Sequence, residues 1–237
     1  MSKILWVDTE TTGLSAKDNG LTEVACIVEI DGVIKDKLLV KINPFTYSKN
    51  VAVEDEALKL TNKSIETLKT YGDSLDEFSS FIQLLDKYID KFDKNDKFQV
   101  AGYNVSFDIE FIRAWFKDNN NSYYGSYFTY KDIDVFAMVK HFKLLKLIGA
   151  TDNDQLKTIC EFFAIPLQAH NALDDIVATK ELYEQLVDRY VITNDKCCQY
   201  CRYHKVNDEF SNDECSHLNI LASADFYCSE FDKKIEE

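Results

Sequence analysis

Two acidic residues two positions apart follow a short apolar segment near the start of the chain. Asp8 and Glu10 come directly after the apolar residues 4–7, and a Thr-Thr-Gly turn signal ends the segment. The apolar run predicts a short buried strand, in which side chains at positions i and i+2 point to the same face. Two neighbouring carboxylates repel each other and are costly to bury without a partner. The pair therefore indicates either a solvated strand end or a site for a divalent metal ion.

Three further residues with suitable side chains lie at predicted element boundaries. Asp108 follows a predicted strand in the first turn of a helix, where the helix macrodipole alone would explain a carboxylate. His170 lies in a predicted loop, and Asp175 lies in the first turn of the helix that follows it. Each residue alone has an ordinary structural explanation. Their joint occurrence in this order favours one shared cleft.

These residues lie in three short segments that resemble the motifs of a known family. The segments are DTETTGL at residues 8–14, NVSFD at residues 104–108, and His170 with Asp175 five positions later. They are similar to the three exonuclease motifs of the DEDDh family of 3′–5′ exonucleases, which includes the proofreading subunit of bacterial DNA polymerase III and ribonuclease T. The similarity covers residues 3–190, since the segment around LKTIC at residues 156–160 also resembles the family's helix before its third motif.

The resemblance implies a ribonuclease H-like fold and a role for each of these side chains. His170 would be the general base, because a histidine with a pKa near about 6.5 accepts the proton of the attacking water near neutral pH. Two Mg²⁺ or Mn²⁺ ions, which prefer oxygen ligands, would activate that water and stabilise the departing 3′-oxygen. The five-residue spacing argues against the neighbouring Asp174. The four implied metal-binding carboxylates are Asp8, Glu10, Asp108 and Asp175.

The implied substrate is the single-stranded 3′ end of DNA or RNA, which would be cut to 5′-mononucleotides. The backbone around Thr11 and Thr12 would hold the terminal 3′-hydroxyl, and Leu14 would lie beside the terminal base. Plain packing at a turn explains Leu14 nearly as well. Two alternatives stay open: a noncatalytic adaptor that binds a partner through the cysteine-rich tail, and a hydrolase of very short oligonucleotides.

A cluster of cysteines marks the end of the chain, where five of the seven fall between positions 197 and 228. Spacings of 2, 13 and 12 intervening residues fit a four-thiolate zinc site. An iron–sulfur cluster would use the same ligands, and the remaining alternative is a tail with incidental thiols. His204 and His217 are possible substitutes, and Cys197 is a competing ligand. The candidate ligands are Cys198, Cys201, Cys215 and Cys228.

Composition and charge narrow the classes of protein. The 237 residues are 46% hydrophobic, which is typical of a globular protein, and the formal net charge is −14. Residues 1–191 carry a net charge of −9 and residues 192–237 carry −5, which argues against tight nonspecific binding to long duplexes. Without an apolar run of membrane-spanning length or a secretory signal, clustered cysteines favour metal binding over disulfides. We therefore expect a cytoplasmic protein.

The elements that position the candidate site read as a mixed α/β fold. Residues 21–30 and 33–42 flank the hairpin signal Asp31-Gly32, so they and residues 4–7 predict three early antiparallel strands. Later strands at residues 98–103 and 128–133 alternate with helices, including one from an N-cap at Ser106 and one from residue 172 to 190. We expect an exonuclease domain at residues 1–191 and a metal-binding tail at residues 192–237.

Overall fold

The structure is a computed structural model that describes residues 2–167, 171–190, 204–207, 212–215 and 220–222. The chain divides into two compact units, residues 1–183 and 184–237. This division falls within the last long helix, eight residues before the domain boundary expected from the sequence.

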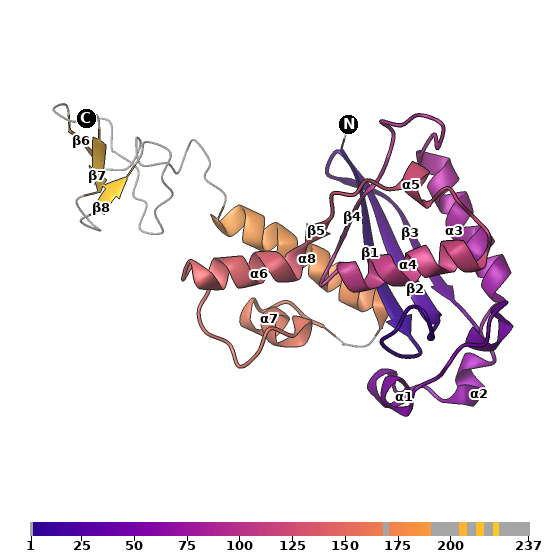
Figure 1. Cartoon of the computed structure of the whole chain (residues 1–237). Coiled ribbons are helices and arrows are strands. Elements are labelled where there is room, and N and C mark those ends of the chain that lie inside the picture. The colour runs from indigo at the N-terminus through magenta and orange to yellow at the C-terminus, as the bar shows by residue number, and fades with distance from the viewer. Residues whose placement is uncertain (1, 168–170, 191–203, 208–211, 216–219, 223–237) are drawn as a thin grey trace. The chain divides into compact units, whose positions relative to one another are not determined.

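A five-stranded mixed sheet forms the centre of the first unit, in the order β3-β2-β1-β4-β5 (Figure 1). β1 pairs antiparallel with β2 and β2 with β3, whereas β4 and β5 continue the sheet in parallel with β1. Asp31 and Gly32 both have positive φ, as a tight hairpin between β2 and β3 requires. The predicted fold class is confirmed. The strands are β1 (Lys3–Thr11), β2 (Leu21–Ile30), β3 (Val33–Lys41), β4 (Gln99–Gly102) and β5 (Ile133–Asp134).

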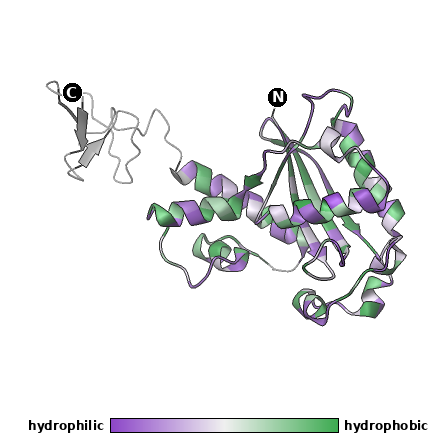
Figure 2. Cartoon of the chain, viewed as in Figure 1, coloured by the Kyte–Doolittle hydropathy of each residue, from purple (hydrophilic) through white to green (hydrophobic). Residues whose placement is uncertain are grey.

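Helices α3 and α4 cover one face of the sheet. Their aromatic side chains interlock: the rings of Phe78 and Trp115 meet edge to face at 5.1 Å between centroids. They pack on Leu5 and Val7 of β1, which point to this face. Figure 2 shows hydrophobic residues of these helices interleaved with hydrophilic ones, as amphipathic helices on a core require. The helices are α1 (Asp55–Thr61), α2 (Ile65–Leu68), α3 (Ser74–Tyr88), α4 (Ser106–Asp118), α5 (Tyr124–Tyr127), α6 (Val135–Leu144), α7 (Leu156–Phe162) and α8 (Ala172–Tyr190), with a 3₁₀ turn at Pro44–Thr46.

Helix α8 packs on the opposite face of the sheet. Trp6 of β1 meets Tyr183 edge to face at 5.1 Å between ring centroids. The Trp6 indole donates a hydrogen bond to Glu29 Oε2 at 3.1 Å, and Lys180 Nζ lies 3.1 Å from the same oxygen. Because side chains alternate along a strand, Asp8 and Glu10 share the face of Trp6. The alternation therefore turns both acids toward the start of α8.

Two predicted element boundaries are wrong. The strand expected at residues 128–133 is reduced to the two residues of β5, with one isolated bridge between Phe98 and Phe128. Phe128 is buried in the core, and the next residue, Thr129, forms a turn by accepting a hydrogen bond from the Lys131 amide. Ser106 is the first residue of α4, not its N-cap, because Val105 already has helical dihedrals.

The second unit contains a small antiparallel sheet of three strands in the order β6-β7-β8. Its strands are β6 (His204–Asn207), β7 (Asn212–Cys215) and β8 (Ile220–Ala222). Among the helices in the described ranges, none combines the length and the apolar character needed to cross a membrane.

Candidate active site

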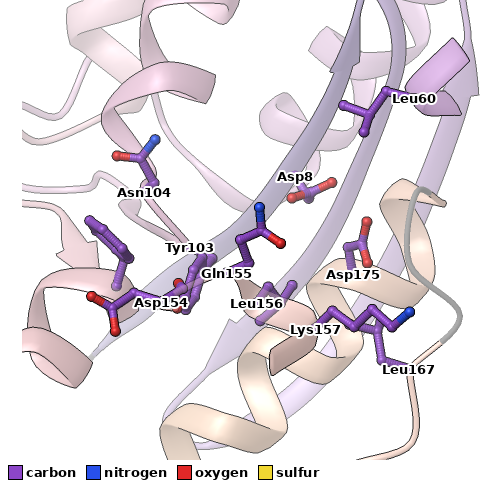
Figure 3. Close-up of a pocket in the computed structure, with 11 residues that line it drawn as sticks. Asp8, Leu60, Tyr103, Asn104, Asp154, Gln155, Leu156, Lys157, Leu167 and Asp175 are labelled. Carbon is purple, nitrogen blue, oxygen red and sulfur yellow. Dashed lines mark hydrogen bonds between the residues drawn. The ribbon is translucent and has the colours of Figure 1, made fainter. Parts of the chain in front are cut away.

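Three acidic side chains from two distant parts of the sequence meet in one place. Ligand oxygens of Asp8, Glu10 and Asp175 all lie within 4.8 Å of one another. Asp8 and Glu10 come from the second half of β1, and Asp175 comes from the first turn of α8. Figure 3 shows Asp8 on its strand and Asp175 on the helix that faces it. The crossing of α8 over the end of β1 thus builds an oxygen-rich cluster.

Asp108 lies beside this cluster but approaches from the other side of the sheet. It is 4% exposed in the first turn of α4, and the Thr9 hydroxyl donates a hydrogen bond to Asp108 Oδ1 at 2.7 Å. Its carboxylate is not among the three that lie within 4.8 Å of one another. Its charge nevertheless acts on Asp8. All four predicted acids therefore lie at the same end of β1: Asp8, Glu10 and Asp175 form the cluster, and Asp108 lies next to it.

Burial and mutual repulsion weaken the acidity of these groups. Burial raises the pKa of Asp8 well above its usual range, and the charges of Asp108 and Asp175 raise it further. Burial also raises the pKa of Glu10 to about 7, against the lowering effect of the Lys63 ammonium. The pKa of Asp108 rises to about 7 for the same reason, although its hydrogen bond from Thr9 opposes the rise. An added cation would relieve this repulsion.

A fifth acid, Glu23 of β2, lies directly opposite Glu10 in the antiparallel pair. It is 3% exposed, and Lys63 Nζ lies 2.9 Å from its Oε1. The Tyr71 hydroxyl donates a hydrogen bond to the same oxygen at 3.3 Å, and Lys41 Nζ lies 3.7 Å away. Glu23 is therefore neutralised by side chains of the protein itself.

The residues of the cluster fit a divalent metal site. Every donor in it is a carboxylate oxygen, which is the ligand type that Mg²⁺ and Mn²⁺ prefer. Burial and the charges of neighbouring acids raise the pKa values of Asp8 and Glu10, and a bound cation would offset both effects. Asp8 is only partly buried, so the cluster is open to solvent on one side.

A cleft of about 730 Å³ opens from Asp8 and Asp175 along the sheet edge (Figure 3). Its far wall is rigid: Tyr103 meets Phe136 edge to face at 5.5 Å, and the Tyr103 hydroxyl donates to the Asp154 carbonyl at 2.5 Å. Such a cleft has room for at least one nucleotide beside the carboxylates. Its other lining residues are Leu60, Asn104, Gln155, Leu156, Lys157 and Leu167.

The turn after β1 holds the residues expected to contact substrate. Thr12 is 1% exposed; its hydroxyl donates to the Ala52 carbonyl at 2.6 Å and accepts from the Gly20 amide at 3.0 Å. The hydroxyl of Thr11 donates to the Gly13 carbonyl at 2.7 Å. Leu14 is 82% exposed. The Thr12 side chain therefore stabilises the turn through its hydrogen bonds, while the Leu14 side chain is exposed to solvent.

Several predicted site residues lie outside the described part of the chain. His170 is one of them, and so are Cys198, Cys201 and Cys228. Cys215 is the last residue of β7, where its backbone pairs with β6 and β8. The general base and the tail's metal site therefore stay predictions.

A family comparison matches most of the chain. The model of the RNase T exonuclease family, described as "Exonuclease", matches residues 5–183, which include β1, α4 and the start of α8. The chain belongs to this exonuclease family. A comparison of the sequence with curated proteins gave no match.

Experimental structures show that the exonuclease shares its fold with E. coli Exonuclease I. The complex of that enzyme with a dT13 oligonucleotide has a TM-score of 0.66 at 18% identity, covering 80% of this chain and 42% of that one. The zinc-ion-bound form of its single-stranded DNA complex has a TM-score of 0.67 at 19% identity, covering 80% and 41%. The exonuclease thus spans less than half the length of these relatives.

Sequence reasoning did not single out several residues that surround the cluster in the exonuclease. Thr9 lies inside the first motif, and its odd position on β1 is a signal that it faces α4 and Asp108. Glu23 is one of two acids in the largely apolar β2, which marks it as unusual but not as a neighbour of Glu10. Lys63 carries no such signal, because it lies in a surface turn between two short helices.

Proposed function

We propose that this chain is a divalent-metal-dependent 3′–5′ exonuclease that releases 5′-mononucleotides from single-stranded ends of DNA or RNA. The observation that carries the proposal is the convergence of Asp8, Glu10 and Asp175 within 4.8 Å, with Asp108 beside them. Membership of the exonuclease family supports it. The single-stranded DNA held by E. coli Exonuclease I supports a single-stranded substrate.

The carboxylates would hold two Mg²⁺ or Mn²⁺ ions. When bound, the ions supply Lewis-acid activation of water and stabilise charge on the departing 3′-oxygen. Asp8 interacts electrostatically with Asp108, Asp175 and Glu10, so it would be one of the metal ligands. Thr9 holds the Asp108 carboxylate in one orientation through its hydrogen bond. Cation binding would lower the raised pKa values of Glu10 and Asp108 and keep both ionised.

His170 would accept the proton of the attacking water. It directly precedes Asn171, whose carbonyl accepts a hydrogen bond from the Asp175 amide at 2.9 Å. The Asn171 side chain also caps the start of α8 by accepting from the Leu173 amide at 3.1 Å. These contacts tie the chain next to His170 to the turn that carries Asp175, which supports the assignment.

The cleft would bind the 3′ end of the strand. Thr11 and Thr12 lie in the turn next to Glu10, where their backbone groups would hold the terminal hydroxyl. Exposed Leu14 would lie beside the terminal base. Lys157 is exposed in the cleft wall (Figure 3) and would contact a backbone phosphate.

The test uses end-labelled single-stranded DNA, single-stranded RNA and dinucleotides with Mg²⁺ or Mn²⁺. We expect 5′-mononucleotides from the wild type and none from Asp8→Ala, His170→Ala or Asp175→Asn. Asp174→Asn is the matched control, because Asp174 is an adjacent acid outside the cluster and should keep wild-type activity. Undiminished activity in any of the first three variants would remove that residue from the site.

The same assay separates the alternatives. A noncatalytic adaptor would release nothing from any substrate, although clustered acids with raised pKa values have no purpose in an adaptor. Cleavage of dinucleotides alone would identify a hydrolase of very short oligonucleotides, which the net charge of −14 would suit. Neither outcome would fit the main proposal.

For the tail, residues 192–237, we propose a zinc site formed by Cys198, Cys201, Cys215 and Cys228. The spacing of the cysteines supports it. The tail would be stabilised by this metal and would dock a protein partner or handle substrate. Cys26 and Cys160, both free thiols, suit a reducing cytoplasmic compartment. Elemental analysis of purified protein should find zinc; iron would indicate a cluster, and neither metal would reject both.

A further inference from the structure

A second cleft, of about 580 Å³, lies at the opposite end of the sheet from the carboxylates. Lys94 and Lys97 line it from the segment that leads into β4, and Lys131 lines it from the segment that leads into β5. Because β4 and β5 run parallel to β1, these segments lie beside the start of β1, whereas Asp8 and Glu10 lie toward its end. Figure 1 shows α5, which also lines this cleft, at the same end as the N-terminus.

The cleft carries a concentration of positive charge that is unusual for this chain. Lys94, Lys97, Arg113 and Lys131 line it, and none of its lining residues is acidic. The chain as a whole carries a net charge of −14. None of these four cations forms an ion pair within the described ranges, whereas the nearby Asp96 is paired with Lys3 at 2.5 Å. The lining of the cleft is therefore basic; Lys97 donates a hydrogen bond to the Gly125 carbonyl, and Asp132, which is outside the lining, acts on Tyr124.

Aromatic rings are interleaved with these cations. Tyr130 is 86% exposed, and the Lys131 ammonium lies 5.8 Å from its ring centroid. The Arg113 guanidinium lies 4.8 Å from the centroid of the Tyr124 ring, which holds it in place at the cleft wall. An exposed tyrosine beside lysines offers a surface on which a base can stack while the cations contact phosphates.

We propose that this basic–aromatic cleft binds a single-stranded segment of nucleic acid away from the end being hydrolysed. The proposal rests on the proposed function, since it takes the same class of molecule as the ligand. Asp8 and Glu10 lie five and seven residues beyond the start of β1, so at roughly 3.3 Å per residue the two sites lie about 20 Å apart. An acidic protein segment would use the cations but gain nothing from the solvent-exposed face of Tyr130, which is why nucleic acid is favoured.

The test measures binding of the full-length chain to fluorescein-labelled dT30 by anisotropy, in EDTA so that no hydrolysis occurs. The variant Lys94→Gln/Arg113→Gln/Lys131→Gln should bind at least about tenfold more weakly at low salt, with a salt slope reduced by about 2. Tyr130→Ala should weaken binding about fivefold or more through lost stacking. The matched control is Lys35→Gln/Lys37→Gln/Lys117→Gln, which removes three exposed cations elsewhere and should bind like the wild type.

Further binding measurements distinguish the failure of this proposal from a failure of the proposed exonuclease function. In an Asp8→Asn background, which the proposed function requires to be inactive, the Lys94→Gln/Arg113→Gln/Lys131→Gln changes should weaken dT30 binding by the same factor as in the wild type. Equal losses in the test and control triple variants would mean that only net charge matters and would overturn the proposal. Unchanged binding in Tyr130→Ala, together with equally tight binding of poly-glutamate, would overturn it in favour of an acidic protein ligand.

Discussion

Two glutamates side by side on neighbouring strands lie in different surroundings. Glu23 of β2 has Lys63 at 2.9 Å and a hydrogen bond from Tyr71. Its cross-strand partner Glu10 lies in the cluster with Asp8 and Asp175, where burial raises its pKa to about 7 against the lowering effect of the same Lys63 ammonium. Both side chains have little exposure, 9% for Glu10 and 3% for Glu23. What differs is that Lys63 forms its ion pair with Glu23, whereas Glu10 lies among other carboxylates.

This difference indicates where the chain is built for stability and where it is built for a ligand. A buried acid with its own lysine is a structural ion pair, whose loss costs stability. Neighbouring carboxylates repel one another and destabilise the folded protein unless a bound cation neutralises them. The same substitution, from carboxylate to amide, should therefore have opposite effects in the two groups.

The largest expected effect is on catalysis in the carboxylate cluster. Asp8→Asn should lower metal-dependent hydrolysis by roughly a thousandfold or more, because it removes a carboxylate that interacts with Asp108, Asp175 and Glu10. In EDTA the same variant should be more stable than the wild type by about 1 kcal/mol, since a repelling charge is gone. Initial rates on labelled oligonucleotides and urea unfolding measure the two effects. A loss of stability of Asp8→Asn in EDTA would contradict the comparison between the carboxylate cluster and the Glu23–Lys63 pair.

The stability of the protein should change in the opposite direction when the Glu23–Lys63 pair is broken. Glu23→Gln should lower the free energy of unfolding by about 3 kcal/mol, because Lys63 is left largely buried without its acid. Urea unfolding in EDTA, with Asp8→Asn measured in parallel, gives the sign of the change in the free energy of unfolding for each variant. Wild-type stability of Glu23→Gln would show that the Glu23–Lys63 pair is not a stabilising element.

A smaller effect is expected at Thr9, which supports one acid without being charged. Thr9→Val removes the 2.7 Å hydrogen bond to Asp108, so hydrolysis should fall by about tenfold and stability by about 1 kcal/mol. Thr22→Val is a suitable control, since Thr22 is also a buried β-strand threonine but lies on the neighbouring strand β2. An equal loss of activity in both variants would point to a general packing defect.

The smallest effect is a pH dependence of stability. Folding raises the pKa values of Glu10 and Asp108 to about 7, so their protonation stabilises the metal-free fold below about pH 4.5. That contribution is lost as the pH rises through 7. Thermal unfolding in EDTA should therefore give a falling Tm between pH 5 and pH 8, with a smaller fall in Asp108→Asn. In Mn²⁺ the stabilisation by the metal should instead grow with pH, because the ion binds the ionised acids.

The sequence predicts the parts of this site that depend on local rules. The period of two along a strand places Asp8 and Glu10 together, and the helix start at residue 172 is found where the pattern puts it. The fold class follows from the hairpin signal and from the alternation of later strands and helices. These features need only near neighbours in the sequence.

The pairing of Glu23 with Lys63 could not be predicted in the same way. The register that sets Glu23 opposite Glu10 depends on the turn at residues 12–20, whose bonds involve Thr12, Asn19 and the distant Ala52. The strand expected at residues 128–133 is interrupted after Phe128, which is extended and bridged to Phe98, because Thr129 and Lys131 form a turn. Long-range packing decides the first case, and a local turn decides the second.

The most direct test of the central claim is anomalous diffraction from crystals of the full chain soaked in Mn²⁺. Manganese peaks should lie among the carboxylates of Asp8, Glu10 and Asp175, with Asp108 next to them, and should be absent from the Glu23–Lys63 pair. Manganese bound at other residues while these four carboxylates stay without an ion would contradict the account.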